Sequence, residues 1–453
     1  MPGLTVIGVA GLVLMLLLMM LRLPVALAML LVGFFGTAMA NASKFLHLGM
    51  ASDQAWSKAW TIAFSNISGE AFEAASNYNL LVIPMFVLMG SIAGVSGMSN
   101  DLFKSAYRWM GHFRGGLASA TIAACAGFAA LSGSSLASAV TMGRVALPAM
   151  KTYKYDDSLA TGTVAAGGTL GFLIPPSGGM IIYAILTDQS IGRLFMAGII
   201  PGIMLTLLFI ATIAIVVVRN PAAGPRGERS STREKFESLV DAIPILTVIA
   251  ITIGGMYTGY FTPVEASSAG AFFTFVVAAL KRKLTLEKLR IVVLQSMSAT
   301  ATIFMILIGA FVFIPFMSLT ELPTRLITLL TSLPIGEFGV LAAIVAAYLV
   351  LGMFLESMAM LVLTLPVVIP IAIALNWDLV WFGIIVVILL EMGMISPPVG
   401  INVFVVKSIV PDVPMRRIFN GIWPFWLAML AMVVLLVVFP DIALYLPRTI
   451  VGI

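Results

Sequence analysis

Two short segments of this chain combine glycine and paired proline in a way that could bind ions. Residues 171–178 read GFLIPPSG and residues 393–400 read GMISPPVG, so both follow the pattern Gly-x-x-x-Pro-Pro-x-Gly. Because proline has no N–H group, each pair leaves two preceding helical carbonyl groups without their usual donors. Carbonyl oxygens are ligands that small hard cations such as Na⁺ prefer. The helical segment that begins after each break could face an anion with its free N–H groups.

A single break of this kind could be an ordinary proline kink, but this one is duplicated. The two segments are 222 residues apart, and the same offset pairs Ser135 with Ser357, Pro148 with Pro370, Asp156 with Asp378 and Gly171 with Gly393. Chance rarely aligns the residues that fix backbone shape, so the sequence indicates an internal repeat. The duplication therefore favours functional breaks over kinks.

Two further polar segments stand between apolar arms at matching places in the repeat. Residues 131–135 read LSGSS and supply three hydroxyl groups, while residues 352–357 read GMFLES and supply a carboxyl group. Serine clusters in apolar helices more often serve packing, but at the tip of a hairpin we expect them to face the breaks. Glu356 and Glu391 are acids within apolar sequence, which marks either a functional site or a buried structural pair. Arg144 either neutralises one of these acids or faces water.

The composition shows what kind of element must position these residues. Hydrophobic residues make up 60% of the 453 residues and charged residues only 10%, far from the roughly 25% charged residues of soluble domains. Apolar runs of about 20 residues predict membrane-spanning helices, and they lack the alternation of barrel strands. The single cysteine, Cys125, excludes an internal disulfide. The net charge of +5 fits basic cytoplasmic loops rather than nucleic-acid binding.

The chain is thus predicted to be an all-α polytopic membrane protein built from two halves. Membrane-spanning helices are expected at residues 3–21, 24–42, 79–97, 159–187, 194–218, 242–262, 263–280, 290–316, 380–407 and 419–438. Re-entrant hairpins are expected at 117–150 and 338–372, and the Pro-Pro pairs break the helices 159–187 and 380–407. A polar loop at 219–235 separates the halves. The predicted organisation is a first repeat at 1–218, a cytoplasmic linker at 219–241 and a second repeat at 242–453.

Basic residues predict the orientation of these spans. With the N-terminus on the periplasmic side, the cytoplasm receives Arg22, Lys104, Arg108, Arg114, the 219–235 loop, residues 281–283, Lys407, Arg416 and Arg417. Only Lys44, Lys58, Arg193, Arg325 and Arg448 fall on the other side. This distribution obeys the positive-inside rule. Each half then has an odd number of crossings, so the second repeat is inverted relative to the first, an architecture typical of secondary transporters.

The motifs also resemble a known family over essentially the full chain. The segments 130–135 (ALSGSS), 168–177 (GTLGFLIPPS), 190–195 (SIGRLF) and 396–400 (SPPVG) are similar to those of the large membrane subunit of tripartite ATP-independent periplasmic (TRAP) transporters; the matches continue at Pro148, Asp156, Pro201, Glu356, Pro366 and Pro370. The resemblance implies an elevator-type transporter that imports organic acids on a Na⁺ gradient. It also implies two partners: a small membrane subunit of four helices and a periplasmic substrate-binding protein.

The resemblance further implies two Na⁺ sites. One would use Ser132, Ser134, Gly171, Ile174 and Pro176, and the other Gly352, Gly393, Ser396 and Val399. The candidate substrate contacts are Ser135, Ser177, Glu356 and Ser357. Na⁺ is the only cofactor expected. Because no four-helix segment precedes Pro2, we expect the small subunit to be a separate chain, for which the amphipathic stretches 99–113 and 317–333 are candidate contacts; in-plane helices that stabilise this subunit alone are the alternative.

Other classes of function fit less well. An enzyme is not expected, since there are only two histidines, no H-E-x-x-H motif and no G-x-S-x-G motif. An ion channel could use re-entrant loops, yet the inverted repeat with broken helices favours alternating access. A proton-coupled anion transporter of the same architecture, working without a binding protein, is the closest alternative. The bacterial inner membrane is the expected location, while the transported acid (sialic acid, a C4-dicarboxylate or a similar solute) stays open.

Overall fold

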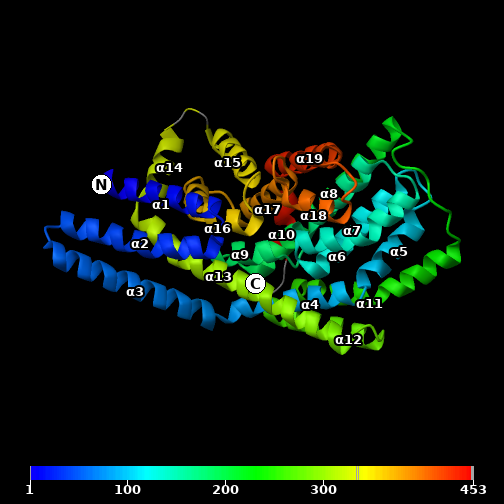
Figure 1. Ribbon diagram of the computed structural model, residues 1–453, viewed down its shortest axis with the longest axis horizontal. Helices are drawn as coiled ribbons and strands as arrows, with labels where there is room; N and C mark the ends of the chain where they lie inside the picture. Colours follow the sequence, from blue (N-terminus) through cyan, green and yellow to red (C-terminus); the bar gives the residue numbers. More distant parts are fainter. Residues whose placement is uncertain (1, 333, 335, 450–453) are drawn as a thin grey trace. The chain divides into compact units, whose positions relative to one another are not determined.

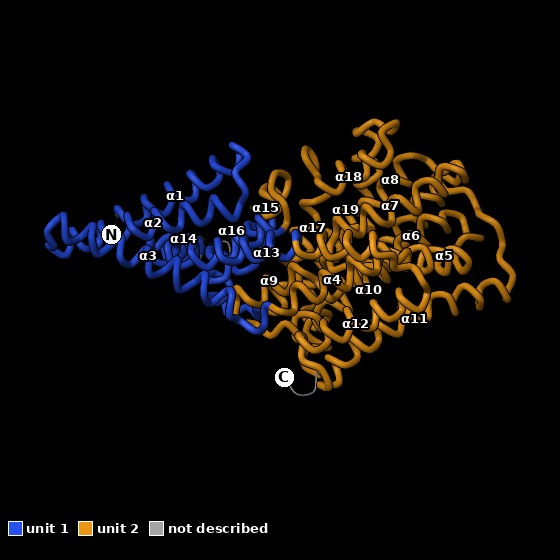
Figure 2. The backbone as a smooth tube through the Cα atoms, turned by 60° about the horizontal axis from the view of Figure 1, so that its bottom comes forward, with its two compact units in different colours: residues 1–80, 298–346, 358–379 blue, residues 81–297, 347–357, 380–453 orange. Residues whose placement is uncertain are grey.

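The computed structural model describes residues 2–332, 334 and 336–449, and the regular structure in these ranges is helical (Figure 1). Ten segments among the described residues are long and apolar enough to cross a bilayer. The predicted all-α membrane fold is thereby confirmed. The described helices divide into two compact units, shown in different colours in Figure 2. Unit 1 comprises residues 1–80, 298–346 and 358–379, and unit 2 comprises residues 81–297, 347–357 and 380–453.

Unit 1 is built mainly from long helices that pack side by side. Its elements are α1 (Pro2–Met20), α2 (Val25–His47), α3 (Ser52–Ser76), the short 3₁₀ helix Tyr78–Leu81, the second part of α13 (Leu286–Leu319), α14 (Leu322–Ser332) and most of α15 (Gly336–Gly352) and α16 (Ser357–Ala374). Glycines allow close approach between these helices: a Cβ atom at Gly33 would lie 2.8 Å from the carbonyl oxygen of Val312, and one at Gly36 would meet the Phe316 ring.

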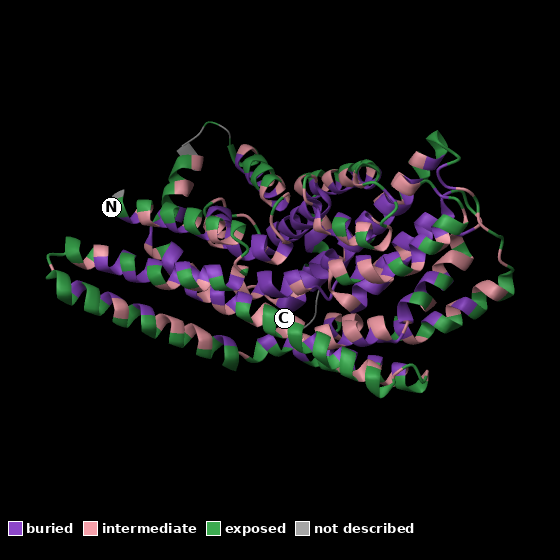
Figure 3. Cartoon of the chain, viewed as in Figure 1, coloured by how far each residue is buried: buried purple, intermediate pink, exposed green. Residues whose placement is uncertain are grey.

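Unit 2 contains the remaining helices. These are α4 (Val82–Val95), α5 (Met98–Met110), α6 (Gly116–Ser132), α7 (Ser135–Thr152), α8 (Asp157–Leu173), α9 (Gly178–Leu186), α10 (Ile191–Arg219), α11 (Thr232–Tyr257), α12 (Pro263–Leu280), α17 (Leu379–Ile395), α18 (Ile401–Ile409), α19 (Met415–Val438) and α20 (Asp441–Thr449). Helices α8 and α17 are the most deeply buried, with every residue of 159–173 and 380–395 covered (Figure 3). Only glycines fit where α8 meets α19, at Gly162 and Gly421. The core of unit 2 is thus formed around the two helices that precede the breaks.

The helix bounds repeat at the offset seen in the sequence. A shift of 222 residues places α8, Asp157–Leu173, on α17, Leu379–Ile395. The hairpin expected at 117–150 is formed by α6 and α7, and the one expected at 338–372 by α15 and α16. Both compact units take segments from both halves of the chain. The bounds of the two sequence repeats, 1–218 and 242–453, stay a prediction.

One helix was not expected from the sequence, and two expected amphipathic stretches are helical. Helix α3 (Ser52–Ser76) has 25 residues and was not predicted, because its alternation of polar and apolar residues is too mixed for a membrane span. The amphipathic stretches 99–113 and 317–333 correspond to α5 and α14, although residue 333 lies outside the described residues. Helix α5 buries Leu102 and Phe103 within unit 2 and forms ion pairs with α11 through Lys104 and Arg108. One face of α5 therefore packs within this chain. This packing agrees with the alternative stated above, in which the amphipathic helices stabilise this subunit, and contact of the small subunit with α5 stays a prediction.

Candidate functional site

The first break separates α8 from α9 at residues 174–177. Pro176 cannot supply an N–H group to the carbonyl of Phe172, and the Ser177 hydroxyl donates a hydrogen bond to this carbonyl instead. The same hydroxyl accepts a hydrogen bond from the Met180 N–H at 3.4 Å and so caps α9. Ser177 is fully buried. Its hydroxyl thus holds the break in shape, and the predicted contact of Ser177 with substrate is untested.

The tip of the first hairpin lies directly against this break. Gly133 ends α6 in the left-handed region, with φ of 59°, a conformation that glycine adopts without strain. Its carbonyl accepts a hydrogen bond from the Gly178 N–H at 3.2 Å. A Cβ atom at Gly133 would lie 2.7 Å from the Pro176 carbonyl oxygen, and one at Gly171 would lie 2.6 Å from the Ser134 carbonyl oxygen. The absence of side chains at both glycines therefore permits the contact between tip and break.

Three of the five residues predicted for the first Na⁺ site are directly involved in this contact: Gly171 and Pro176 come from the break, and Ser134 comes from the tip. Ser132 ends α6 at the same tip. The hydroxyls of Ser132 and Ser138 are 2.8 Å apart, and the Ser134 hydroxyl caps α7 by accepting from the Ala137 N–H. Ile174, the fifth residue, follows α8 at the break itself. The structure thus brings the oxygens expected for one cation site into one neighbourhood.

The second break and the second hairpin tip repeat this arrangement. Gly352 ends α15, and a Cβ atom at Gly393 would lie 2.6 Å from the Gly352 Cα. The Ser396 hydroxyl donates to the Met392 carbonyl at 2.6 Å, as a helix-terminal serine can. Val399 lies in the segment between α17 and α18, after which Gly400 begins α18 with φ of 59°. The structure thus brings Gly352 against Gly393 and places Ser396 and Val399 at the same break, while the second Na⁺ site itself stays a prediction.

The other predicted polar residues gather between the two tips. Ser357 donates a hydrogen bond to Glu391 Oε1 at 3.4 Å, which joins the second tip to α17. Ser135, from the first hairpin, lies beside the same carboxyl group, and the Glu356 carboxyl is close enough to act on it electrostatically. Arg144 is exposed on α7, which fits the expectation that it faces water. The predicted substrate contacts Ser135, Ser357 and Glu356 thus share one neighbourhood, and Ser177 belongs to the first break.

Two side chains at the second break were not predicted. Trp426 on α19 donates its indole N–H to the Ser396 hydroxyl at 3.0 Å. Asn402 is fully buried at the start of α18, and neither atom of its amide makes a hydrogen bond. Asn402 could have been suspected as a lone amide in an apolar segment two residues after Gly400. The repeat gave no signal for it, because residue 180 at the equivalent place is methionine.

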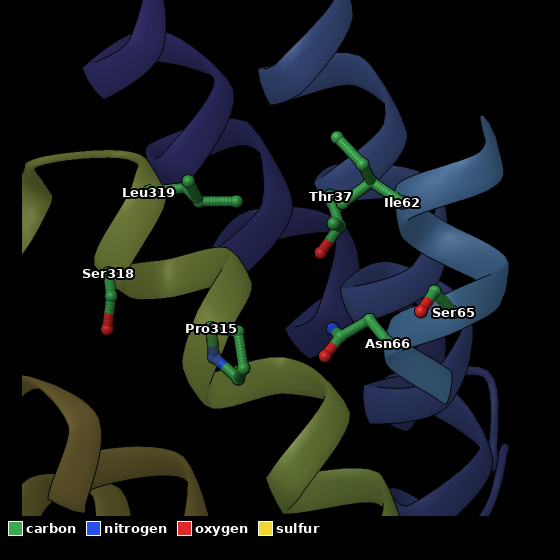
Figure 4. Close-up of a pocket in the computed structure, with 7 residues that line it drawn as sticks. All are labelled: Thr37, Ile62, Ser65, Asn66, Pro315, Ser318 and Leu319. Carbon is green, nitrogen blue, oxygen red and sulfur yellow. The ribbon is translucent and has the colours of Figure 1, made fainter. Parts of the chain in front are cut away.

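A groove in unit 1 is separate from these residues. It has a volume of about 580 Å³ and lies between α2, α3 and α13 (Figure 4). Its lining is mixed polar and apolar, and consists of Thr37, Ile62, Ser65, Asn66, Pro315, Ser318 and Leu319. None of the predicted site residues lines this groove.

Comparison with known proteins identifies the family. Residues 12–442 match the family described as "Tripartite ATP-independent periplasmic transporter, DctM component". The chain is 35% identical to the C4-dicarboxylate TRAP transporter large permease protein DctM of Pseudomonas aeruginosa, over 83% of this chain and 88% of that protein. It is 33% identical to the sialic acid TRAP transporter large permease protein SiaM of Vibrio cholerae, over the same shares of the two chains.

A solved structure has a related fold. The YdaH transporter of Alcanivorax borkumensis matches with a TM-score of 0.60 and 16% identity, over 86% of this chain and 90% of that chain. This likeness concerns the fold alone, whereas the permease proteins are related in sequence over most of their length. The described helices, their two breaks and the sequence matches lead to one conclusion: the chain belongs to the DctM family, the large permease component of TRAP transporters.

Proposed function

We propose that this chain is the large transport subunit of a Na⁺-coupled secondary transporter that imports small organic acids across the bacterial inner membrane. A periplasmic substrate-binding protein delivers the acid, and a separate small membrane subunit completes the transporter. The N-terminus lies on the periplasmic side. The substrate belongs to the class of C4-dicarboxylates, sialic acids or similar acids, which the names of the two permease relatives support.

One observation carries this proposal: each Pro-Pro break is in direct contact with the tip of a hairpin. The contacts run from Gly133 to Pro176 and from Gly352 to Gly393. Freed carbonyl groups and serine hydroxyls form an oxygen-rich environment inside an apolar protein, where such groups are retained only when they are paired or bind an ion. Two such places supply two Na⁺ sites, which agrees with the ligands that the family resemblance implies.

The start of a half-helix beside each break suits the anionic group of the substrate. Helix α9 begins at Gly178 and α18 at Ile401. The N–H groups of a first helical turn are available to an anion unless a cap uses them, and in α9 the Gly133 carbonyl and the Ser177 hydroxyl use those of Gly178 and Met180. We propose that the two tips and the two broken helices move together as the carrier part of an elevator. In this account Ser135, Ser357 and Glu356 contact the substrate from the tips.

Reconstitution of the three components tests the proposal. Proteoliposomes that contain the chain alone should show no uptake of the acid. Addition of the small subunit and the substrate-loaded binding protein should restore uptake, and replacement of Na⁺ by choline at constant pH should abolish it. Robust uptake by the isolated chain would contradict the tripartite assignment and favour a transporter that works without a binding protein.

A further inference from the structure

The carboxyl group of Glu391 is buried in unit 2 with half of its hydrogen-bonding capacity unused. The residue is 1% exposed. Its Oε1 accepts the hydrogen bond from Ser357 at 3.4 Å, whereas its Oε2 has no hydrogen-bond partner. Within the described part of the chain, the ion pairs of the basic residues are made to other acids, at Asp101, Asp157, Glu234, Glu237, Asp241, Asp412 and Asp441. Among the residues that the structure describes, no basic side chain forms an ion pair with Glu391.

A second buried oxygen faces the same place. Ser135, at the start of α7, is 3% exposed, and its hydroxyl makes no hydrogen bond, although it lies beside the Glu391 carboxyl group. Ser357, also 3% exposed, reaches this carboxyl from the start of α16. Oxygens from both hairpins therefore converge on one carboxyl group. Glu356, close enough to act on Glu391 electrostatically, adds a second acidic group to the neighbourhood.

This arrangement is unfavourable for an anion unless a positive charge is present. A buried carboxyl group is retained in proteins when it is paired, takes up a proton or coordinates an ion. Two carboxyl groups next to a site for an organic acid would also repel the substrate. Because the convergent groups of Glu391, Ser135 and Ser357 are all oxygens, they suit a hard cation rather than one that prefers nitrogen or sulfur.

We propose that Glu391, Ser135 and Ser357 hold a further Na⁺ ion, distinct from the two at the Pro-Pro breaks. The ion joins the two hairpin tips through α17 and shields the substrate from the acids, so that Ser135 and Ser357 contact the substrate through the ion rather than directly; this inference rests on the proposed Na⁺-coupled function. The site has no copy in the first half. The position equivalent to Glu391 is Thr169, whose hydroxyl donates to the Ala166 carbonyl at 2.6 Å within α8.

A count of bound ions tests the site directly. The purified full chain is reconstituted in nanodiscs, and binding of ²²Na⁺ is measured at constant ionic strength with choline as the replacing cation. Glu391→Gln should bind one ion fewer per chain than the wild type, since the amide keeps the shape but not the charge. Ser135→Ala should keep the count and weaken the last ion about tenfold, which corresponds to about 1.4 kcal/mol. Thr169→Val, at the equivalent place in the first half, should bind as the wild type does.

Several outcomes would overturn the inference. The inference is wrong if Glu391→Gln binds as many Na⁺ ions per chain as the wild type. If this variant binds the same number with weaker affinity, Glu391 only positions the second break. The inference is also wrong if Glu391→Gln binds the wild-type number of ions and loses a pH dependence of Na⁺ affinity that the wild type shows. Glu391 would then bind a proton in place of Na⁺. If Glu391→Gln does not fold, Ser135→Ala tests the site instead. An unchanged affinity for the last Na⁺ ion in Ser135→Ala would then contradict the inference. Uptake by the three-component system is a separate readout, so a failure of Na⁺-driven transport can be told apart from a failure of this site.

Discussion

At the scale of single residues, serine hydroxyls bond helical carbonyl groups at both breaks, and at the first break the hydroxyl replaces the donor that Pro176 lacks. The Ser177 hydroxyl donates to the Phe172 carbonyl, and the Ser396 hydroxyl donates to the Met392 carbonyl. Such bonds stabilise an interrupted helix without a continuous hydrogen-bond ladder. These bonds already occupy some of the carbonyl and hydroxyl oxygens at each break. Only the remaining oxygens at the breaks and hairpin tips are available to a cation.

Substitution of Gly393 tests the contact between the second break and its hairpin tip. In Gly393→Ala the new Cβ would meet the Gly352 Cα at 2.6 Å, and this Cα belongs to the backbone and cannot turn away. We expect a loss of roughly 1–3 kcal/mol in stability, visible as a lower Tm, together with a weaker apparent affinity for Na⁺. Gly171→Ala should act in the same way at the first break, where it meets the Ser134 carbonyl.

A matched control comes from a glycine in open surroundings. Gly254 lies in α11, and a Cβ atom there would meet nothing within 4 Å. Gly254→Ala should leave Na⁺ affinity unchanged and should stabilise the helix by about 0.5–1 kcal/mol. Equal effects of the two alanine substitutions on Na⁺ affinity would contradict the role of the Gly393 contact.

The prolines themselves provide a second test at this scale. The Gly393 carbonyl already accepts the Ser396 N–H at 3.0 Å. Pro397→Ala together with Pro398→Ala would add N–H groups that compete with a cation for the carbonyls of Gly393 and Met394. We expect a folded protein of near-normal Tm whose apparent Na⁺ affinity falls about tenfold or more, at least about 1.4 kcal/mol. The double substitution at Pro175 and Pro176 should behave alike. Wild-type Na⁺ dependence in both double variants would show that the breaks are only structural.

At the scale of elements, the sequence predicted the parts whose signals are local and strong. The Pro-Pro pairs located the breaks at 174–177 and 396–400, and the small polar centres located both hairpin tips. Helix α3 escaped prediction because its mixed surface gives no clear apolar run. The bond from Trp426 to Ser396 could not be predicted either, since it depends on the packing of α19 against the break rather than on any pattern along the chain.

The loop before α11 ends in a capping box that makes this helix sensitive to acid. Ser231 and Glu234 bond each other's backbone N–H groups, and these bonds, assisted by Arg108, lower the pKa of Glu234 below its ordinary value of 4.5. A lowered pKa in the folded state means that the stabilisation is present above the ordinary pKa and is lost as the pH falls through the folded value. The protection factor for hydrogen exchange at the first turn of α11, corrected for the intrinsic rate at each pH, should therefore fall only below about pH 4.5.

Removal of the cap tests this assignment without a change of pH. Ser231→Ala should lower the free energy of local opening at the start of α11 by about 1 kcal/mol, again measured by hydrogen exchange. Thr232→Ala, one residue later, takes no part in the capping box and serves as the control. If the two variants exchange equally fast, the capping box does not determine where α11 begins.

At the scale of the whole molecule, both breaks and both hairpin tips belong to unit 2. The segments come from places far apart in the chain, at 116–186, 347–357 and 380–409. An internal repeat explains this gathering, because equivalent elements of two halves can pack as counterparts. Composition and the repeat were sufficient to predict the helical membrane class, the two breaks and the two hairpin tips. The convergence of Ser135, Ser357 and Glu391 was not predicted, because tertiary packing creates it.

The coupling of transport to Na⁺ is the central claim, and the uptake of a monoanionic substrate under controlled gradients tests it most directly. In proteoliposomes with all three components, an inward Na⁺ gradient at constant pH should drive uptake. Two or more Na⁺ ions per monoanion would carry net positive charge inward, so an inside-negative potential should increase uptake, with about 2.3 kcal/mol available per net charge for each 100 mV. Uptake driven by a proton gradient in Na⁺-free medium, or uptake of the monoanion that is independent of voltage, would contradict this account.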